Sequence, residues 1–113
     1  MALHNLAGQK AEEEVNKYLK KRGYKILETN WKNRWGEIDI IAEKSGCVHF
    51  VEVKYRTSGE QGSGLEYITP TKLRQMKFAA EMWISNNDQF DEYVLSAAEV
   101  SGPNFEIDFI EEV

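Results

Sequence analysis

The stretch GEIDIIAEKSGCVHFVEVKYR, residues 36–56, has the pattern of two β-strands joined by a tight turn at KSG. Charged residues alternate with apolar ones, and successive side chains of a strand point to opposite faces of a sheet. Glu37 and Asp39 therefore share one face of the first strand, and Glu52 and Lys54 share one face of the second. Because a short turn makes the strands antiparallel neighbours, these side chains are expected to converge if the two polar faces point the same way.

Two interpretations of this polar face stay open from the spacing alone. In the first, it is the solvated face of an ordinary hairpin, with weak cross-strand pairs. In the second, it is a site, since the flanking isoleucines and valines indicate central strands, which seldom carry charge without a function. Carboxylates held close together repel each other unless a cation neutralises them. Oxygen ligands suit Mg²⁺, and a neighbouring lysine can stabilise charge that develops at a phosphate.

The rest of the chain divides into further helices and strands. Apolar residues at three- and four-residue spacing predict a helix over residues 5–22. A second helix is predicted to begin with Thr69 as N-cap and Pro70 as its first residue, and to end near Asn86. The order α-β-β-β-α-β-β predicts one α/β domain over residues 1–113, with a mixed sheet and the last strand at an edge. The expected strands are residues 24–31, 36–43, 47–56, 92–100 and 105–112, with turns at 30–36 and 101–104 and a glycine-rich loop at 57–64.

Composition places the chain among ordinary globular proteins. It has 113 residues, of which 42% are hydrophobic and 29% charged. Cys47 is the only cysteine, so an internal disulfide is excluded and the cytoplasm is the simplest location. No apolar run is long enough to span a bilayer, and the first residues lack the apolar core of a secretory signal, so no membrane association is expected.

Charge is distributed unevenly along the chain. The net charge is −5, yet all 14 Lys and Arg residues lie between Lys10 and Lys77. Residues 78–113 contain nine acidic residues and neither Lys nor Arg. A basic face formed by the first two thirds could steer a polyanion, or the acidic last third could simply keep the protein in solution. Charge alone does not decide between these two interpretations.

A resemblance to known nucleases favours the interpretation of the polar face as a functional site. Asp39, followed after twelve residues by Glu52-Val53-Lys54, resembles the PD-(D/E)xK signature of restriction-endonuclease-like enzymes. A wider set of motifs resembles the YraN-like family, small bacterial proteins predicted to be endonucleases and similar in pattern to archaeal Holliday-junction resolvases. The resemblance implies a restriction-endonuclease-like fold with Mg²⁺ as cofactor and Mn²⁺ as substitute. The matching residues are Gly8, Glu12, Tyr18-Leu19, Gly23-Tyr24, Asn30-Trp31, Gly36 to Asp39, Phe50 to Lys54, Arg56, Gly64, Ile68-Thr69 and Lys72.

The resemblance implies a role for each residue of the cluster. Asp39 and Glu52 would be the metal carboxylates, with the Val53 carbonyl as a further metal ligand. Lys54 would be the catalytic lysine. Glu12 would be the acid contributed by the first helix; periodicity alone does not choose between it and a neighbouring glutamate.

Residues around the cluster have less specific expectations. Glu37 is expected to lie beside the metal ligands and support them without binding the metal itself, or else to be a solvated side chain. His49 shares the face of Val51, opposite Glu52, and is expected to be a core histidine with its hydrogen bonds satisfied. The basic side chains expected to contact nucleic acid, or alternatively to form solvated faces, are Lys32, Arg34, Arg56, Lys72 and Arg74.

The function expected from this resemblance is metal-dependent hydrolysis of phosphodiester bonds in DNA, at branched or single-stranded structures. The alternatives are a nucleic-acid-binding module of the same fold that does not cut, a hydrolase of small phosphate compounds, and a protein-interaction domain. The chain departs from the family pattern at Gln89, where a basic residue is usual. The resolvases resembled work as homodimers, so a homodimer is also expected. Aromatic and aliphatic residues of the acidic third either pair with the second copy or cover the core, the latter being favoured: Phe90, Tyr93, Phe105, Phe109 and Ile110.

Overall fold

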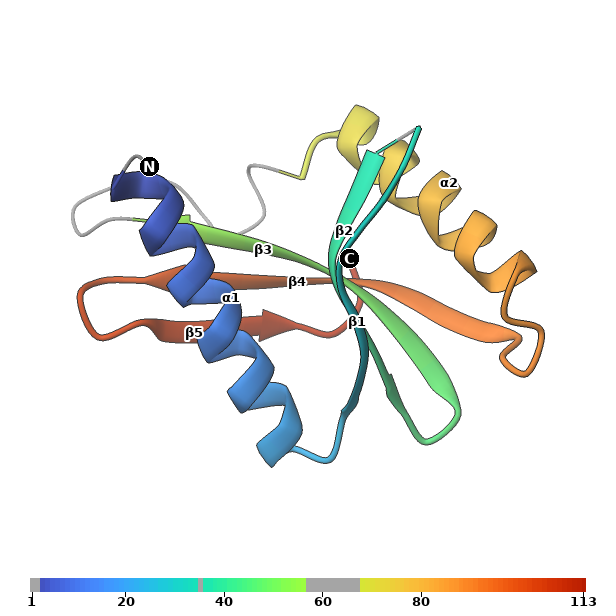
Figure 1. Cartoon of the computed structure of the whole chain (residues 1–113), viewed down its shortest axis with the longest axis horizontal. Coiled ribbons are helices and arrows are strands. Elements are labelled where there is room, and N and C mark those ends of the chain that lie inside the picture. The colour runs from blue at the N-terminus through green and yellow to red at the C-terminus, as the bar shows by residue number, and fades with distance from the viewer. Residues whose placement is uncertain (1–2, 35, 57–67) are drawn as a thin grey trace.

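The computed structural model describes residues 3–34, 36–56 and 68–113, with side chains from Leu6 onward. The predicted loop at 57–64 and Trp35 lie outside the described residues. The predicted order of elements is confirmed (Figure 1). The elements are α1 (Leu3–Lys21), β1 (Lys25–Asn33), β2 (Gly36–Lys44), β3 (Cys47–Arg56), α2 (Pro70–Ser85), β4 (Glu92–Ser101) and β5 (Glu106–Ile110).

The strands form one mixed five-stranded sheet in the order β1-β2-β3-β4-β5. Strands β3 and β4 are parallel, and the other neighbouring pairs are antiparallel. A parallel pair needs a crossover connection, and α2 supplies it. Strand β5 lies at an edge of the sheet, as predicted. The observed architecture is a mixed α/β fold compatible with that of the nucleases.

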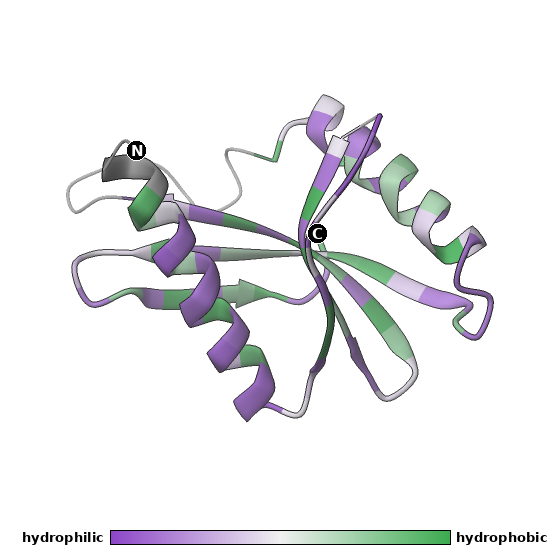
Figure 2. Ribbon diagram, in the orientation of Figure 1, coloured by the Kyte–Doolittle hydropathy of each residue, from purple (hydrophilic) through white to green (hydrophobic). Residues whose placement is uncertain are grey.

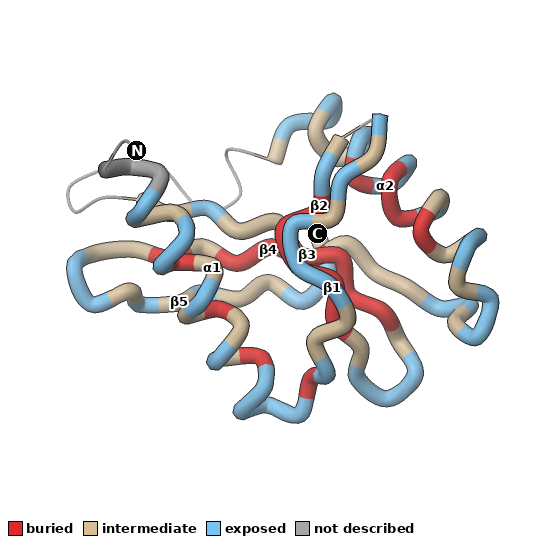
Figure 3. Tube along the Cα trace, in the orientation of Figure 1, coloured by how far each residue is buried: buried red, intermediate tan, exposed pale blue. Residues whose placement is uncertain are grey.

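The two helices cover opposite faces of the sheet. Along β3, Val51 packs with the buried residues of α1, whereas the next residue back, Phe50, packs with those of α2. The ring of Phe50 meets Trp83 of α2 edge-on, with 5.8 Å between centroids. Apolar and buried segments accordingly coincide on the central strands and the inner faces of the helices (Figures 2 and 3). Neither helix among the described residues is long and apolar enough to cross a membrane.

Two local predictions are wrong. Strand β1 continues to Asn33, so the turn expected from residue 30 onward is shorter. The strict alternation that put Glu37 and Asp39 on one face of β2 would also put Ile38 and Ile40 together on the other face. Instead, Ile38 packs on the α2 side and Ile40 on the α1 side. The regular alternation therefore breaks at Asp39, because β2 leaves its pairing with β3 at this point.

The aromatic residues of the acidic third cover the core, as favoured from the sequence. Phe105 and Phe109 pack against the α1 side, and Phe90 and Tyr93 pack against the α2 side. These four rings are consequently engaged within the chain, and the support that they gave to a dimer surface is removed.

Candidate active site

The site lies where β2 and β3 separate. Their ladder ends with the pair Ile40 and Val51. Beyond it, the backbone N–H of Val53 donates to Oδ2 of Asp39 at 2.8 Å. A side-chain carboxylate thus takes over at the end of the backbone ladder, and the strands run apart to form a fork (Figure 1). The fork explains why a charged residue is tolerated on a central strand, since its oxygen satisfies a backbone donor.

Asp39 is buried at the base of the fork, with 8% of its surface exposed. Burial raises the pKa of its carboxyl, the hydrogen bond from the Val53 N–H lowers it, and the charge of Glu37 raises it again. The net direction is upward. The protein therefore holds this carboxylate in a place where a positive charge would stabilise it.

Glu52 stands beside Asp39 on the neighbouring strand. Its side chain is 15% exposed, and Oε2 lies 3.2 Å from Nζ of Lys72 on α2. Burial, and then the charge of Asp39, raise the pKa of Glu52 to about 7, against the opposing charge of Lys72. A hydrogen bond with the Glu52 side chain in turn lowers the pKa of Asp39. The Lys72 ammonium therefore offsets part of the repulsion between the two acids.

Glu12 of α1 lies close enough to Asp39 for the charge of Asp39 to act on it. Burial and the charge of Asp39 raise its pKa, while a hydrogen bond with the Asn30 side chain lowers it. Glu14, which periodicity could not separate from Glu12, instead pairs with Lys10 and Lys17 on the outer side of α1. The structure thus brings Glu12, and not Glu14, toward the fork.

Lys54 and Glu37 lie at the rim of the fork. Lys54 is exposed on β3, two residues beyond Glu52 and hence on the same face of the strand. Glu37 is exposed on β2, with Oε2 at 3.8 Å from Nζ of Lys32. Its charge raises the pKa of Asp39, so it acts on the acid pair without joining it.

The basic side chains that were expected to contact nucleic acid have different partners in the structure. Lys32 pairs with Glu37, and the half-buried Arg56 pairs with Glu99 on β4. The Arg74 guanidinium donates to the Thr71 hydroxyl and is exposed. Lys72 is not on an outer helix face but contacts Glu52 inside the fork. Arg34 is exposed at the end of β1.

The donor set fits a hard divalent cation. Within residues 3–34, 36–56 and 68–113, no three His, Cys, Asp or Glu side chains are arranged to hold a metal ion as they stand. Glu12 is thus not a third ligand in this arrangement. Mg²⁺, however, is commonly held by only one or two carboxylates, with water and substrate phosphates completing its octahedron. Asp39 and Glu52 supply two such carboxylates, and Lys72 is the positive charge that contacts them here.

Two residues of the site were not identified from the sequence in their present roles. Asn30 adopts a left-handed conformation, φ 52°, inside β1. Asparagine tolerates this region better than most residues, and its side chain reaches Glu12. The signal was an asparagine within a strand pattern. Lys72 was expected to contact phosphate, and its ion pair with Glu52 had no local signal.

The first turn of α2 fixes where Lys72 lies. Thr69 caps the helix, its Oγ1 accepting from the backbone N–H of Lys72 at 3.1 Å, and Pro70 is the first helical residue, both as predicted.

Thr69→Ala is expected to lower the free energy of unfolding by about 1 kcal/mol, because the Lys72 amide loses its acceptor. Thr69→Ser keeps the hydroxyl and should lose much less. Urea unfolding followed by circular dichroism measures both variants. Equal stability of Thr69→Ala and the parent would show that this cap does not hold the start of the helix.

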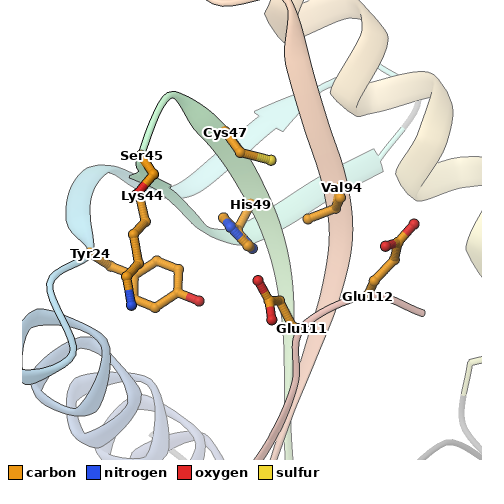
Figure 4. A pocket seen from close by; sticks show the side chains of 8 residues that line it. All are labelled: Tyr24, Lys44, Ser45, Cys47, His49, Val94, Glu111 and Glu112. Atoms are coloured by element: carbon orange, nitrogen blue, oxygen red, sulfur yellow. The ribbon is translucent and has the colours of Figure 1, made fainter.

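A cavity of about 470 Å³ lies away from the fork (Figure 4). The His49 ring at its wall is buried, and Nδ1 lies 3.2 Å from Oγ of Ser96, which donates to the Glu111 carbonyl. Burial lowers the pKa of His49. The prediction of a satisfied core histidine is confirmed. The cavity is lined by Tyr24, Lys44, Ser45, Cys47, His49, Val94, Glu111 and Glu112.

Comparison with known proteins assigns the chain to a family. A family model described as "Uncharacterised protein family UPF0102" matches residues 11–111. A UPF0102 protein of Helicobacter pylori strain HPAG1 is 39% identical over 104 residues, which cover 92% of this chain and 89% of that protein. A UPF0102 protein of Geobacter metallireducens is 45% identical over 92 residues, covering 80% and 75%. One of Syntrophomonas wolfei is 44% identical over 79 residues, covering 70% and 69%. The chain therefore belongs to family UPF0102, the YraN-like family that its motifs indicated.

Proposed function

We propose that this protein is a nuclease that hydrolyses phosphodiester bonds in DNA with the help of Mg²⁺, for which Mn²⁺ can substitute. The observation that carries the proposal is the meeting of Asp39 and Glu52 at the fork, with Lys54 on the same face of β3 as Glu52. The resemblance of Asp39 and Glu52-Val53-Lys54 to the PD-(D/E)xK signature supports the same chemistry.

The residues of the fork divide the work of the reaction. Asp39 and Glu52 would hold the metal, with the Val53 carbonyl as a further oxygen ligand. The bound metal would polarise the phosphate and activate the attacking water. Lys54, exposed at the rim, stabilises the negative charge that develops on the phosphate oxygens. Glu12 lies on α1 near Asp39, where its carboxylate can orient a water molecule.

Contacts along the DNA would come from basic residues near the fork. Lys32 lies near the end of β1, Arg34 directly follows this strand, and Arg74 lies near the start of α2. Exposed basic side chains that flank the acids can bind the phosphates on either side of the cleaved bond. Arg56 is tied to Glu99 and contributes only if this pair opens. We place this activity in the cytoplasm, where Cys47 would stay reduced.

A second copy of the chain would supply a second active site. Each chain offers one fork in its described part, whereas cutting both strands of a duplex or junction requires two active sites. Strands β1 and β5 are the edges of the sheet, and an edge strand can pair with its symmetry mate. We propose a two-fold dimer on this basis, to be tested by sedimentation at micromolar protein.

The test of the activity is a cleavage screen of linear, flapped and four-way DNA with Mg²⁺ or Mn²⁺. The parent protein should cut at least one of these substrates, and chelation with EDTA should stop it. Asp39→Asn should be inactive, because its amide cannot hold the cation as a carboxylate does. Asp88→Asn is the matched control: Asp88 is exposed in the turn before β4, and its loss should leave cleavage unchanged.

The outcome of this screen also separates the alternatives. DNA binding without cleavage by the parent protein would favour a binding module of the same fold. Hydrolysis of a small phosphodiester, with neither binding nor cleavage of DNA, would favour a small-phosphate hydrolase. Binding to DNA should weaken steeply with salt, because each Lys or Arg contact to phosphate releases counterions, whereas a small-molecule enzyme would lack this dependence.

A further inference from the structure

Lys72 occupies an unfavourable place in its own helix. It lies in the first turn of α2, just after Pro70, and its backbone N–H is already capped by Thr69. The N-terminus of a helix carries a partial positive charge, so a lysine ammonium is disfavoured there and an acid preferred. This turn contains no acidic residue. Helix stability therefore does not explain why a lysine stands at this position. Its partner outside the helix does explain it.

That partner is the acid pair of the fork. Nζ of Lys72 lies 3.2 Å from Oε2 of Glu52, with the lysine side chain 31% exposed and the glutamate 15%. The charge of Lys72 lowers the pKa of both Glu52 and Asp39. The ammonium thus contacts the oxygen of one proposed metal ligand and stabilises the other by its charge, which is also what a bound cation would do.

We propose that Lys72 is an exchangeable counter-ion: it offsets part of the negative charge of Asp39 and Glu52 before the metal binds, the metal displaces it from Glu52, and the released ammonium binds a phosphate oxygen of the substrate. This inference rests on the proposed function. The lysine stem is flexible and about a third exposed, so the ammonium can leave Glu52 while α2 stays in place. Once released, it lies beside the metal site and adds a positive charge where the substrate phosphate binds.

The exchange couples the binding of metal to the binding of nucleic acid. Displacing Lys72 weakens metal binding when no substrate is present, and a phosphate that accepts the ammonium recovers part of this loss. Metal should therefore tighten binding of nucleic acid, and nucleic acid should tighten binding of metal by the same factor, because coupling between two binding equilibria is reciprocal. A lysine that only stabilised the fold would give no such coupling.

The first arm of the test is metal affinity without nucleic acid. Lys72→Met keeps most of the aliphatic stem and removes the charge. It should bind Mn²⁺ about tenfold more tightly than the parent in isothermal titration, because the competing cation is gone. Lys77→Met is the matched control, since Lys77 is exposed on the same helix, and its affinity should match the parent. Unchanged or weaker Mn²⁺ binding by a folded Lys72→Met would overturn the exchange.

The second arm is the coupling to DNA. The affinity for a fluorescent four-way junction is measured with and without Ca²⁺, which takes the place of Mg²⁺ and limits cleavage. The improvement caused by Ca²⁺ should be about fivefold smaller in Lys72→Met than in the parent or Lys77→Met. Equal improvement in all three proteins would overturn the phosphate contact, as would absence of DNA binding by the parent. Neither arm measures cleavage, so an inactive enzyme that passes both would refute the nuclease and leave the exchange standing.

Discussion

Lys54→Ala is expected to slow DNA cleavage by about a hundredfold to a thousandfold, while DNA affinity changes by less than about twofold. The lysine stands on the same face of β3 as Glu52 and is exposed at the rim of the fork. Its charge acts on the phosphate that reacts, and this charge is most valuable when negative charge builds up in the transition state. Affinity depends on several basic side chains, so one lysine supplies little of it.

Single-turnover cleavage and fluorescence anisotropy measure the two quantities for Lys54→Ala separately. Lys20→Ala, on the exposed side of α1, controls for the loss of one lysine charge. If Lys54→Ala cut DNA as fast as the parent, the role assigned to the lysine would be wrong. If parent and variant both bound every substrate and cut none, the binding module would be the better description.

Glu52→Gln is expected to raise the free energy of unfolding of the metal-free protein by about 2 kcal/mol at pH 8. The Glu52 side chain is only 15% exposed and lies beside Asp39, so desolvation and the charge of Asp39 disfavour its charged form in the folded state. Glutamine removes this charge and still fills the space. The gain in stability is reduced by loss of the ion pair with Lys72.

Glu52→Gln should also lose the rise in melting temperature that Mn²⁺ gives the parent by binding the native state.

The carboxyl of Glu52 also determines how the stability of the metal-free protein depends on pH. The pKa of Glu52 rises from 4.5 in the unfolded chain to about 7 in the folded protein. Between these values the folded state holds a proton that the unfolded state has released, so stability falls as pH rises and levels off above about pH 7. Asp39, with a raised pKa, and Glu12 act in the same direction, while Lys72 opposes them.

Denaturant unfolding between pH 5 and pH 8 measures this slope. The slope should be smaller in Glu52→Gln and in the parent saturated with Mg²⁺. A parent whose stability rises over this range would show that the acid pair is not held at a cost. Glu43→Gln is a suitable control, because Glu43 lies on β2 at the opposite end of the sheet and caps the turn at Gly46.

The elements of the fold could be predicted because their signals are local. Strand β3 begins at Cys47 and ends at Arg56, as the alternating pattern indicated. The start of α2 was equally clear, since Thr69 and Pro70 act within one helical turn. His49 was placed correctly in the core because strand geometry fixes its face relative to Glu52.

The geometry of the site could be predicted only in part. The short turn between the strands showed that Asp39 and Glu52 lie on neighbouring strands. It did not show that the ladder would end at Ile40 and that a carboxylate would accept from the Val53 N–H. The pairing of Lys72 with Glu52 depends on how α2 docks on the sheet, which no local pattern encodes.

Anomalous diffraction from crystals grown with Mn²⁺ would locate the metal directly. The expected result is a single strong peak in the fork, about 2.1 Å from one oxygen of Asp39 and one of Glu52, with Lys72 moved off Glu52. A fork in which Lys72 still contacts Glu52 and no peak lies between the two carboxylates, at saturating Mn²⁺, would contradict the proposed active site.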